Sequence, residues 1–88
     1  MSAPAQHLSE FEETVSTLAK AAAHDERLAS DYARLGAYMA GEARTSAAEL
    51  FESLSRYHAI RALEERGQLG AAVYAQHGVV DDPEEPEV

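Results

Sequence analysis

Apolar residues in the first half of the chain recur every three or four positions, which is the spacing of one face of a helix. One stripe consists of Leu8, Phe11, Val15, Leu18 and Ala22, and a second consists of Leu28, Tyr32, Leu35 and Met39. At about 100° per residue, the second stripe lies roughly 100° around the helix from the first. The offset predicts either one long helix that bends or supercoils, or a break near residues 24–26. Because the segment 23–27 contains neither Gly nor Pro, we favour the continuous helix.

The segment 41–46 interrupts the helical pattern near the middle of the chain. Gly41 suits the left-handed conformation that often ends a helix. Ser46, with Glu49 three residues later, forms a capping-box pattern for the next helix. The sequence therefore predicts an all-α fold, an antiparallel helical hairpin of two long helices joined at this turn. The boundaries we expect are 1–6 for a flexible N-terminus, 7–78 for the hairpin, and 79–88 for a disordered acidic tail.

The second half of the chain carries apolar residues on two opposite faces of a helix. The face that begins nearest the turn consists of Ala47, Leu50, Phe51, Leu54 and Tyr57. The other face, roughly 150–180° away, consists of Ile60, Leu63, Gly67 and Tyr74. One straight helix with a single buried face cannot accommodate both sets. Either the helix breaks at 67–70, or the chain has a second contact surface.

The hairpin also predicts which residues of the two helices lie opposite each other. With the turn centred near residue 43 or 44, the numbers of opposed residues should add up to about 87. The resulting pairs are Leu35 with Phe51, Tyr32 with Leu54, Leu18 with Leu69, and Val15 with Val73. The same register brings the small residues 21–23 close to Gly67, where the two backbones would approach closely. The alternative is that these alanines simply favour helix.

Charge and composition exclude several classes of function. The chain has 16 acidic and 7 basic residues, and five of the acids lie in the last eight positions. The bases are scattered, whereas a nucleic-acid surface needs clustered Lys and Arg, so we expect no direct DNA or RNA binding. No apolar run reaches the roughly 18–20 residues of a membrane span, and the N-terminus lacks the features of a signal peptide. The absence of cysteine excludes disulfides and thiolate metal sites and fits a reducing, cytoplasmic location.

Four histidines are the side chains best suited to metal binding or acid–base chemistry: His7, His24, His58 and His77. None lies in a Glu-x-x-His or His-x-x-x-His spacing, so neither a di-iron nor a zinc-protease site is expected. The chain also lacks a Gly-x-Ser-x-Gly elbow and a phosphate-binding Gly loop. We therefore expect no enzyme activity, no metal and no cofactor. His58 is expected to be half buried beside the Leu54–Tyr57 face, where its protonation would make an interface pH-dependent.

The second apolar face is the strongest indication of function, because a chain this small buries little surface by itself. We predict a partner interface that includes Ile60, Leu63, Tyr74 and Tyr38, since tyrosine is enriched at interaction hot spots. The leading interpretation is a non-enzymatic interaction or adaptor protein that dimerises into a four-helix bundle or docks on a larger protein. The alternative is an acidic inhibitor or nucleic-acid mimic, of a phage-encoded anti-defence kind, that occupies a basic groove of its target.

Overall fold

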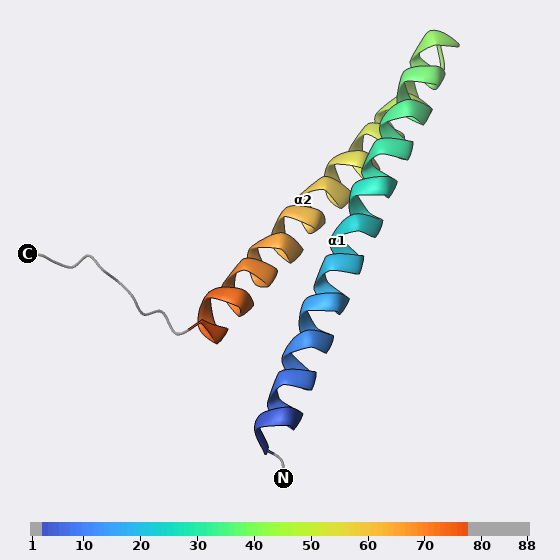
Figure 1. Ribbon diagram of the computed structural model, residues 1–88. Coiled ribbons are helices and arrows are strands. Elements are labelled where there is room, and N and C mark those ends of the chain that lie inside the picture. The colour runs from blue at the N-terminus through green and yellow to red at the C-terminus, as the bar shows by residue number, and fades with distance from the viewer. Residues whose placement is uncertain (1–2, 78–88) are drawn as a thin grey trace, which may run out of the picture.

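The computed structural model describes residues 3–77, with burial described from Ser9 onward. Two helices, α1 (Ala3–Gly41) and α2 (Thr45–Gln76), pack antiparallel on either side of a short turn (Figure 1). Residues 3–77 contain no strand, and the predicted all-α helical hairpin is confirmed. Helix α1 begins inside the segment 1–6, for which flexibility is predicted. The predicted acidic tail 79–88 lies outside the described residues.

Both helices are continuous where a break was the alternative. Helix α1 runs through residues 24–26, and α2 runs through residues 67–70. Gly67 and Gly70 each cost only about 0.5–1 kcal/mol relative to alanine inside a helix, which is too little to interrupt α2. The favoured continuous first helix is confirmed, and the two apolar sets of α2 lie on one unbroken helix.

A Schellman motif ends α1, and its left-handed residue is Ala43, which has a φ of 61°. The amide of Arg44 donates to the carbonyl of Met39 at 2.8 Å, and the amide of Ala43 donates to the carbonyl of Ala40 at 3.0 Å. These are the two hydrogen bonds that define the motif. The prediction that Gly41 is the left-handed cap is therefore wrong, because Gly41 is still helical and the reversal comes two residues later.

The predicted capping box at the start of α2 is also wrong. The N-cap is Arg44, and it makes no side-chain hydrogen bond to the helix. Its carbonyl already accepts the amide of Ala48 at 2.9 Å, so α2 starts before Ser46 can cap it. The connection between the helices is correspondingly shorter than the predicted turn at 41–46.

Each helix carries a row of buried and half-buried residues that are spaced alternately three and four positions apart. This is heptad spacing, and the two rows pack together as one continuous seam between the helices. In α1 the seam consists of Phe11, Val15, Leu18, Ala22, Asp25, Ala29, Tyr32, Gly36 and Met39. In α2 it consists of Ala48, Phe51, Ser55, His58, Ala62, Glu65, Leu69 and Ala72. Residues Phe11 to Ala22 of the first stripe are thus in one seam with Tyr32 and Met39 of the second, whereas Leu28 and Leu35 lie beside it. Small and polar residues fill the seam positions between the two stripes.

The closest approach of the two helices is at Gly36. A Cβ added there would lie 3.3 Å from the Cγ of Glu52 and 3.4 Å from the carbonyl oxygen of Ala48. At Gly67 an added Cβ would meet nothing within 4 Å. The predicted close approach between residues 21–23 and Gly67 is therefore wrong, although Ala22 itself is completely buried.

Contacts across the seam scatter by about one helical turn around the predicted register. Tyr32 stacks on Phe51, with ring centroids 5.9 Å apart, rather than on Leu54. Leu35, the predicted partner of Phe51, lies beside the seam and is more than one-third exposed. Counting outward from the turn therefore predicts, to within about one helical turn, how far along the hairpin each residue lies. Counting does not predict which residue at that distance faces the other helix when that residue is small or polar.

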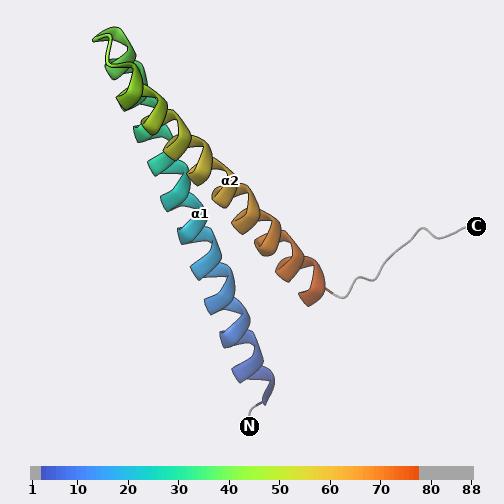
Figure 2. The same ribbon diagram turned by 180° about the vertical axis from the view of Figure 1, so that it is seen from behind.

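The helices lie close together near the turn and diverge toward the opposite end, as both views of the ribbon show (Figures 1 and 2). The seam residues at this open end, including Phe11 and Leu18, are only half buried. Over the described residues, neither helix contains a stretch long and apolar enough to cross a membrane.

Candidate functional site

Small residues form the interior of the hairpin. Among the described residues, the buried hydrophobic side chains are Ala22, Ala48 and Ala62, and no large side chain is fully buried. Seven large apolar or aromatic residues are instead at least 41% exposed: Leu35, Tyr38, Leu50, Tyr57, Ile60, Leu63 and Tyr74. Because apolar burial stabilises by about 25 cal/mol per Å², a single hairpin leaves much of its potential stabilisation unrealised.

Three of the four predicted interface residues share the outer side of α2. Ile60, Leu63 and Tyr74 lie opposite the seam on the helical wheel, and each is between 55% and 72% exposed. We call these three residues the outer α2 face. Gly67 and Gly70 lie between Leu63 and Tyr74 and have open space above them. The face is one helix wide, and its role in binding stays a prediction.

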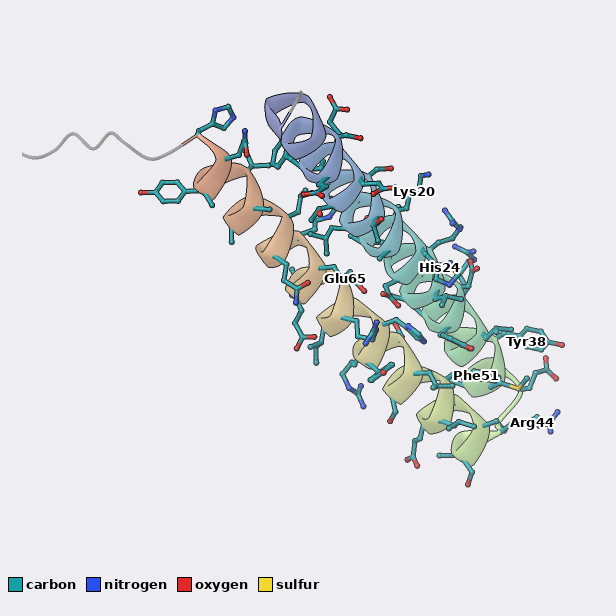
Figure 3. The ribbon with its side chains drawn as sticks, turned by 90° about the horizontal axis from the view of Figure 1, so that it is seen from below. Lys20, His24, Tyr38, Arg44, Phe51 and Glu65 are labelled. Atoms are coloured by element: carbon teal, nitrogen blue, oxygen red, sulfur yellow. The ribbon has the colours of Figure 1, made fainter. Side chains whose placement is uncertain are left out.

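The fourth predicted interface residue, Tyr38, lies elsewhere. It is on α1 close to the turn, and its side chain points away from α2 (Figure 3). The structure therefore does not bring Tyr38 together with the outer α2 face, and the four predicted residues do not form one site.

A second apolar surface lies beside the seam near the turn. Glu26 and Arg66 each follow a seam residue, and they form an ion pair of 2.6 Å on one side of the hairpin. Residues that precede a seam residue therefore share the opposite side. On that side lie Leu28, Leu35 and Tyr38 of α1 and Leu50, Leu54 and Tyr57 of α2, which we call the turn-proximal face. Sequence reasoning assigned the leucines and Tyr57 to the buried faces of the hairpin, because it did not recognise Ala29, Gly36 and Ser55 as seam residues.

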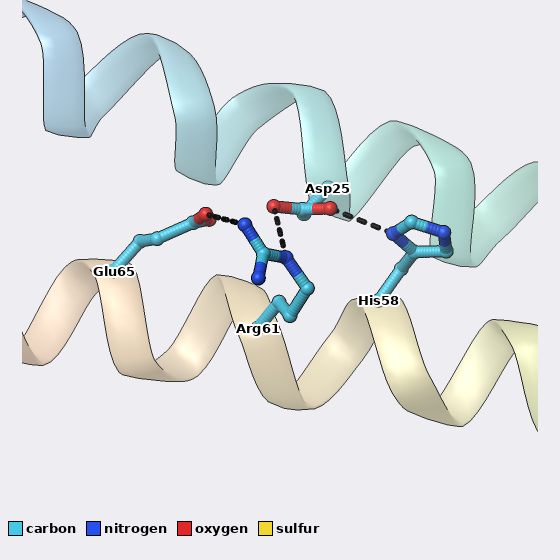
Figure 4. Close-up of polar contacts among 4 residues, drawn as sticks. All are labelled: Asp25, His58, Arg61 and Glu65. Atoms are coloured by element: carbon cyan, nitrogen blue, oxygen red, sulfur yellow. Dashed lines mark hydrogen bonds and ion pairs between the residues drawn. The ribbon is translucent and has the colours of Figure 1, made fainter.

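A polar cluster interrupts the seam at mid-length. Asp25 of α1 is 5% exposed, and its carboxylate accepts a hydrogen bond from Nδ1 of His58 at 2.7 Å (Figure 4). Nε of Arg61 lies 3.6 Å from the other carboxylate oxygen of Asp25, and Nη2 of Arg61 lies 3.3 Å from Glu65. The half-buried position predicted for His58 is confirmed. The apolar pattern does not predict that Asp25 and Glu65 are buried in the seam. Extending the heptad spacing through polar residues as well as apolar ones would have identified both.

The two carboxyls of the cluster are shifted in opposite directions. The hydrogen bond from His58 lowers the pKa of Asp25 below its ordinary value, although burial opposes the shift, and the charge of Arg61 helps to lower it. Burial raises the pKa of Glu65, and the neighbouring Asp25 raises it further. Oε1 of Glu65 is buried without a hydrogen-bond partner in the described part of the chain. Asp25 is therefore held as the anion, whereas Glu65 is protonated more readily than an exposed glutamate.

Two aromatic rings contact His58, one from each helix. Its ring stacks on Tyr32 with centroids 5.7 Å apart and meets the ring of Tyr57 edge-on at 5.0 Å. Ser55, one turn away on α2, donates its hydroxyl to the carbonyl of Ala29 at 2.7 Å. These groups are engaged with one another across the seam, an arrangement that fixes the alignment of the two helices.

Within residues 3–77, no group of three or more His, Asp or Glu side chains is arranged to hold a metal ion. The surfaces that remain available for function are the outer α2 face, the turn-proximal face and the space between the helices at the open end. No protein-family model, no curated protein and no solved structure matches this chain.

Proposed function

We propose that this chain is a non-enzymatic interaction protein that self-associates through the turn-proximal face. One observation carries the proposal. Among the residues whose burial is described, the fully buried apolar side chains are alanines, while large apolar side chains remain exposed. Two helices with such an interior gain little to offset the roughly 1–2 kcal/mol of backbone entropy lost per residue. A second layer of helices would supply the missing burial.

The turn-proximal face suits a second hairpin because both helices contribute to it. Core-facing helices of a bundle are apolar at the two seam positions of the heptad and at one flanking position. Leu28, Leu35 and Leu54 occupy that flanking position here. Two hairpins packed through this face would form a four-helix bundle. The charged cluster supports a structural rather than a catalytic role, since Asp25, His58 and Arg61 bind one another between the helices.

Sedimentation equilibrium over a range of protein concentrations tests the proposal. We expect a dimer at micromolar concentration and a melting temperature that rises with concentration. Leu50→Glu should dissociate the dimer, because Leu50 is exposed in the single hairpin but would be buried in the bundle. Leu63→Glu on the outer α2 face is the matched control and should leave the dimer intact. A cooperative, concentration-independent monomer would contradict self-association, and dissociation by Leu63→Glu alone would move the interface to the outer α2 face.

A further inference from the structure

The diverging ends of the helices border an open groove. Two hollows of about 460 and 250 Å³ adjoin there, and Thr14 lines both. Leu18 and Gln68 meet at the larger hollow, and Phe11 and Ala72 meet at the smaller one. We call these two hollows the open-end groove. The helix segments that line it, 10–18 of α1 and 68–76 of α2, lie at the opposite end of the hairpin from the turn (Figure 2).

The floor of the open-end groove is apolar and matches the spacing of a helix. Phe11 lines the smaller hollow and Leu18 lines the larger one, and both side chains are only half buried. These two residues are seven positions apart, which is about 10 Å along the helix axis. An amphipathic helix that docks in a groove presents anchors three, four and seven residues apart, so its apolar stripe would match this length.

The wall contributed by α1 is acidic. Glu10 lines the smaller hollow and Glu13 lines the larger one. No base occurs in residues 9–19, and the facing segment 67–76 of α2 has no charged residue. Arg66, just before that segment, is already paired with Glu26 through two contacts of 2.6 and 2.8 Å. The negative charge along the groove is therefore not neutralised from within the described hairpin.

We infer that the open-end groove binds a basic amphipathic helix of another protein. A second copy of this chain is a poor occupant, because its own open end would place a second Glu10 and Glu13 against those already there. A helix with an apolar stripe flanked by Lys or Arg would cover the floor and pair with the wall. The inference shares with the proposed function only the premise that the chain acts by binding proteins. It uses a different surface from the turn-proximal face.

Fluorescence anisotropy with the full chain tests the inference. The probe is a labelled synthetic amphipathic helix with a leucine stripe flanked by lysines, and the control peptide has every lysine replaced by glutamate. We expect saturable binding of the basic peptide that weakens with added salt, and no binding of the acidic one. The double variant Glu10→Gln/Glu13→Gln should weaken binding roughly three- to tenfold. Thr14→Trp, at an exposed wall position, should fill the groove and block the peptide.

Leu63→Glu, on the outer α2 face, should bind the peptide as the unmodified chain does. Equal binding of both peptides, failure of the basic peptide to saturate, or a loss of affinity confined to Leu63→Glu would overturn the inference. Sedimentation of the same samples separates this result from the proposed function. If the chain is a dimer that does not bind the peptide, only the inferred binding in the groove is contradicted. If the chain is a monomer that binds the peptide, only the proposed self-association is contradicted.

Discussion

Nδ1 of His58 lies 2.7 Å from the Asp25 carboxylate across the seam. A buried carboxylate of α1 thus binds a side chain of α2. Arg61 approaches the second oxygen of that carboxylate. Buried polar groups of this kind contribute little net stability. In coiled coils, however, a single polar seam residue can fix the register of the helices. In this hairpin of small residues, Asp25 is a buried seam residue that binds side chains of the other helix, so a shift of register would separate it from them.

Asp25→Asn should lower the melting temperature at neutral pH, because His58 and Arg61 lose the negative charge that they bind. The folded pKa of Asp25 is depressed below its ordinary value of 3.8. Its contribution to stability is therefore complete above that value and is lost as the pH falls through the folded pKa. The difference between variant and unmodified chain, followed by circular dichroism, should disappear in strong acid. Glu49→Gln, which changes an exposed carboxylate outside the seam, is the control and should have little effect.

Glu65→Gln should have the opposite effect. The folded pKa of Glu65 is raised above its ordinary value of 4.5, so its favourable contribution is present below pH 4.5 and is lost as the pH rises through the folded pKa. Glutamine imitates the protonated side chain, and its amide can donate to Asp25. The variant should melt at a higher temperature than the unmodified chain at pH 7 and at a similar temperature near pH 4. Glu64→Gln, one residue away and exposed, should behave alike at both values. A lower melting temperature for Glu65→Gln at pH 7 would show that the pair with Arg61 outweighs burial.

The sequence predicts the hairpin because its apolar periodicity and the break near Gly41 are local signals. It does not predict the interior, because the seam continues through Asp25, Ala29, Gly36 and Ser55, which carry no apolar signal. The leucines beside these positions dominate the apolar pattern. The sequence therefore predicts that they are buried, although they lie beside the seam in the single hairpin. The outer α2 face could be recognised from the sequence because its residues are large and opposite the seam. The open-end groove depends on the divergence of the helices, which no local pattern encodes.

Ala43→Gly should stabilise the hairpin by about 1 kcal/mol, because alanine is strained at the positive φ that the Schellman motif requires. Chemical denaturation monitored by circular dichroism measures the change. Gly41→Ala is the matched control. Gly41 is helical, and an added Cβ would meet nothing within 4 Å, so this variant should also stabilise, by about 0.5–1 kcal/mol. Destabilisation by Gly41→Ala would instead place the left-handed residue at Gly41.

Gly36→Ile should destabilise the hairpin more than any other glycine substitution in α1 or α2. A Cβ at this position already lies 3.3 Å from Glu52 and 3.4 Å from the backbone oxygen of Ala48. The flexible side chain of Glu52 can move, whereas the backbone of α2 must shift to admit the rest of an isoleucine. Overpacking of this kind costs about 1–3 kcal/mol. It should also loosen the hairpin near the turn, which amide hydrogen exchange of residues 32–55 would report as faster exchange.

The matched control for Gly36→Ile is Gly67→Ala, since a Cβ at Gly67 meets open space. This variant should gain about 0.5–1 kcal/mol from the better helix propensity of alanine. If Gly67 were instead the site of close approach that small-residue pairing suggests, Gly67→Ala would destabilise and Gly36→Ile would be tolerated. The two variants thus locate the closest contact between α1 and α2 by opposite signs of the change in unfolding free energy.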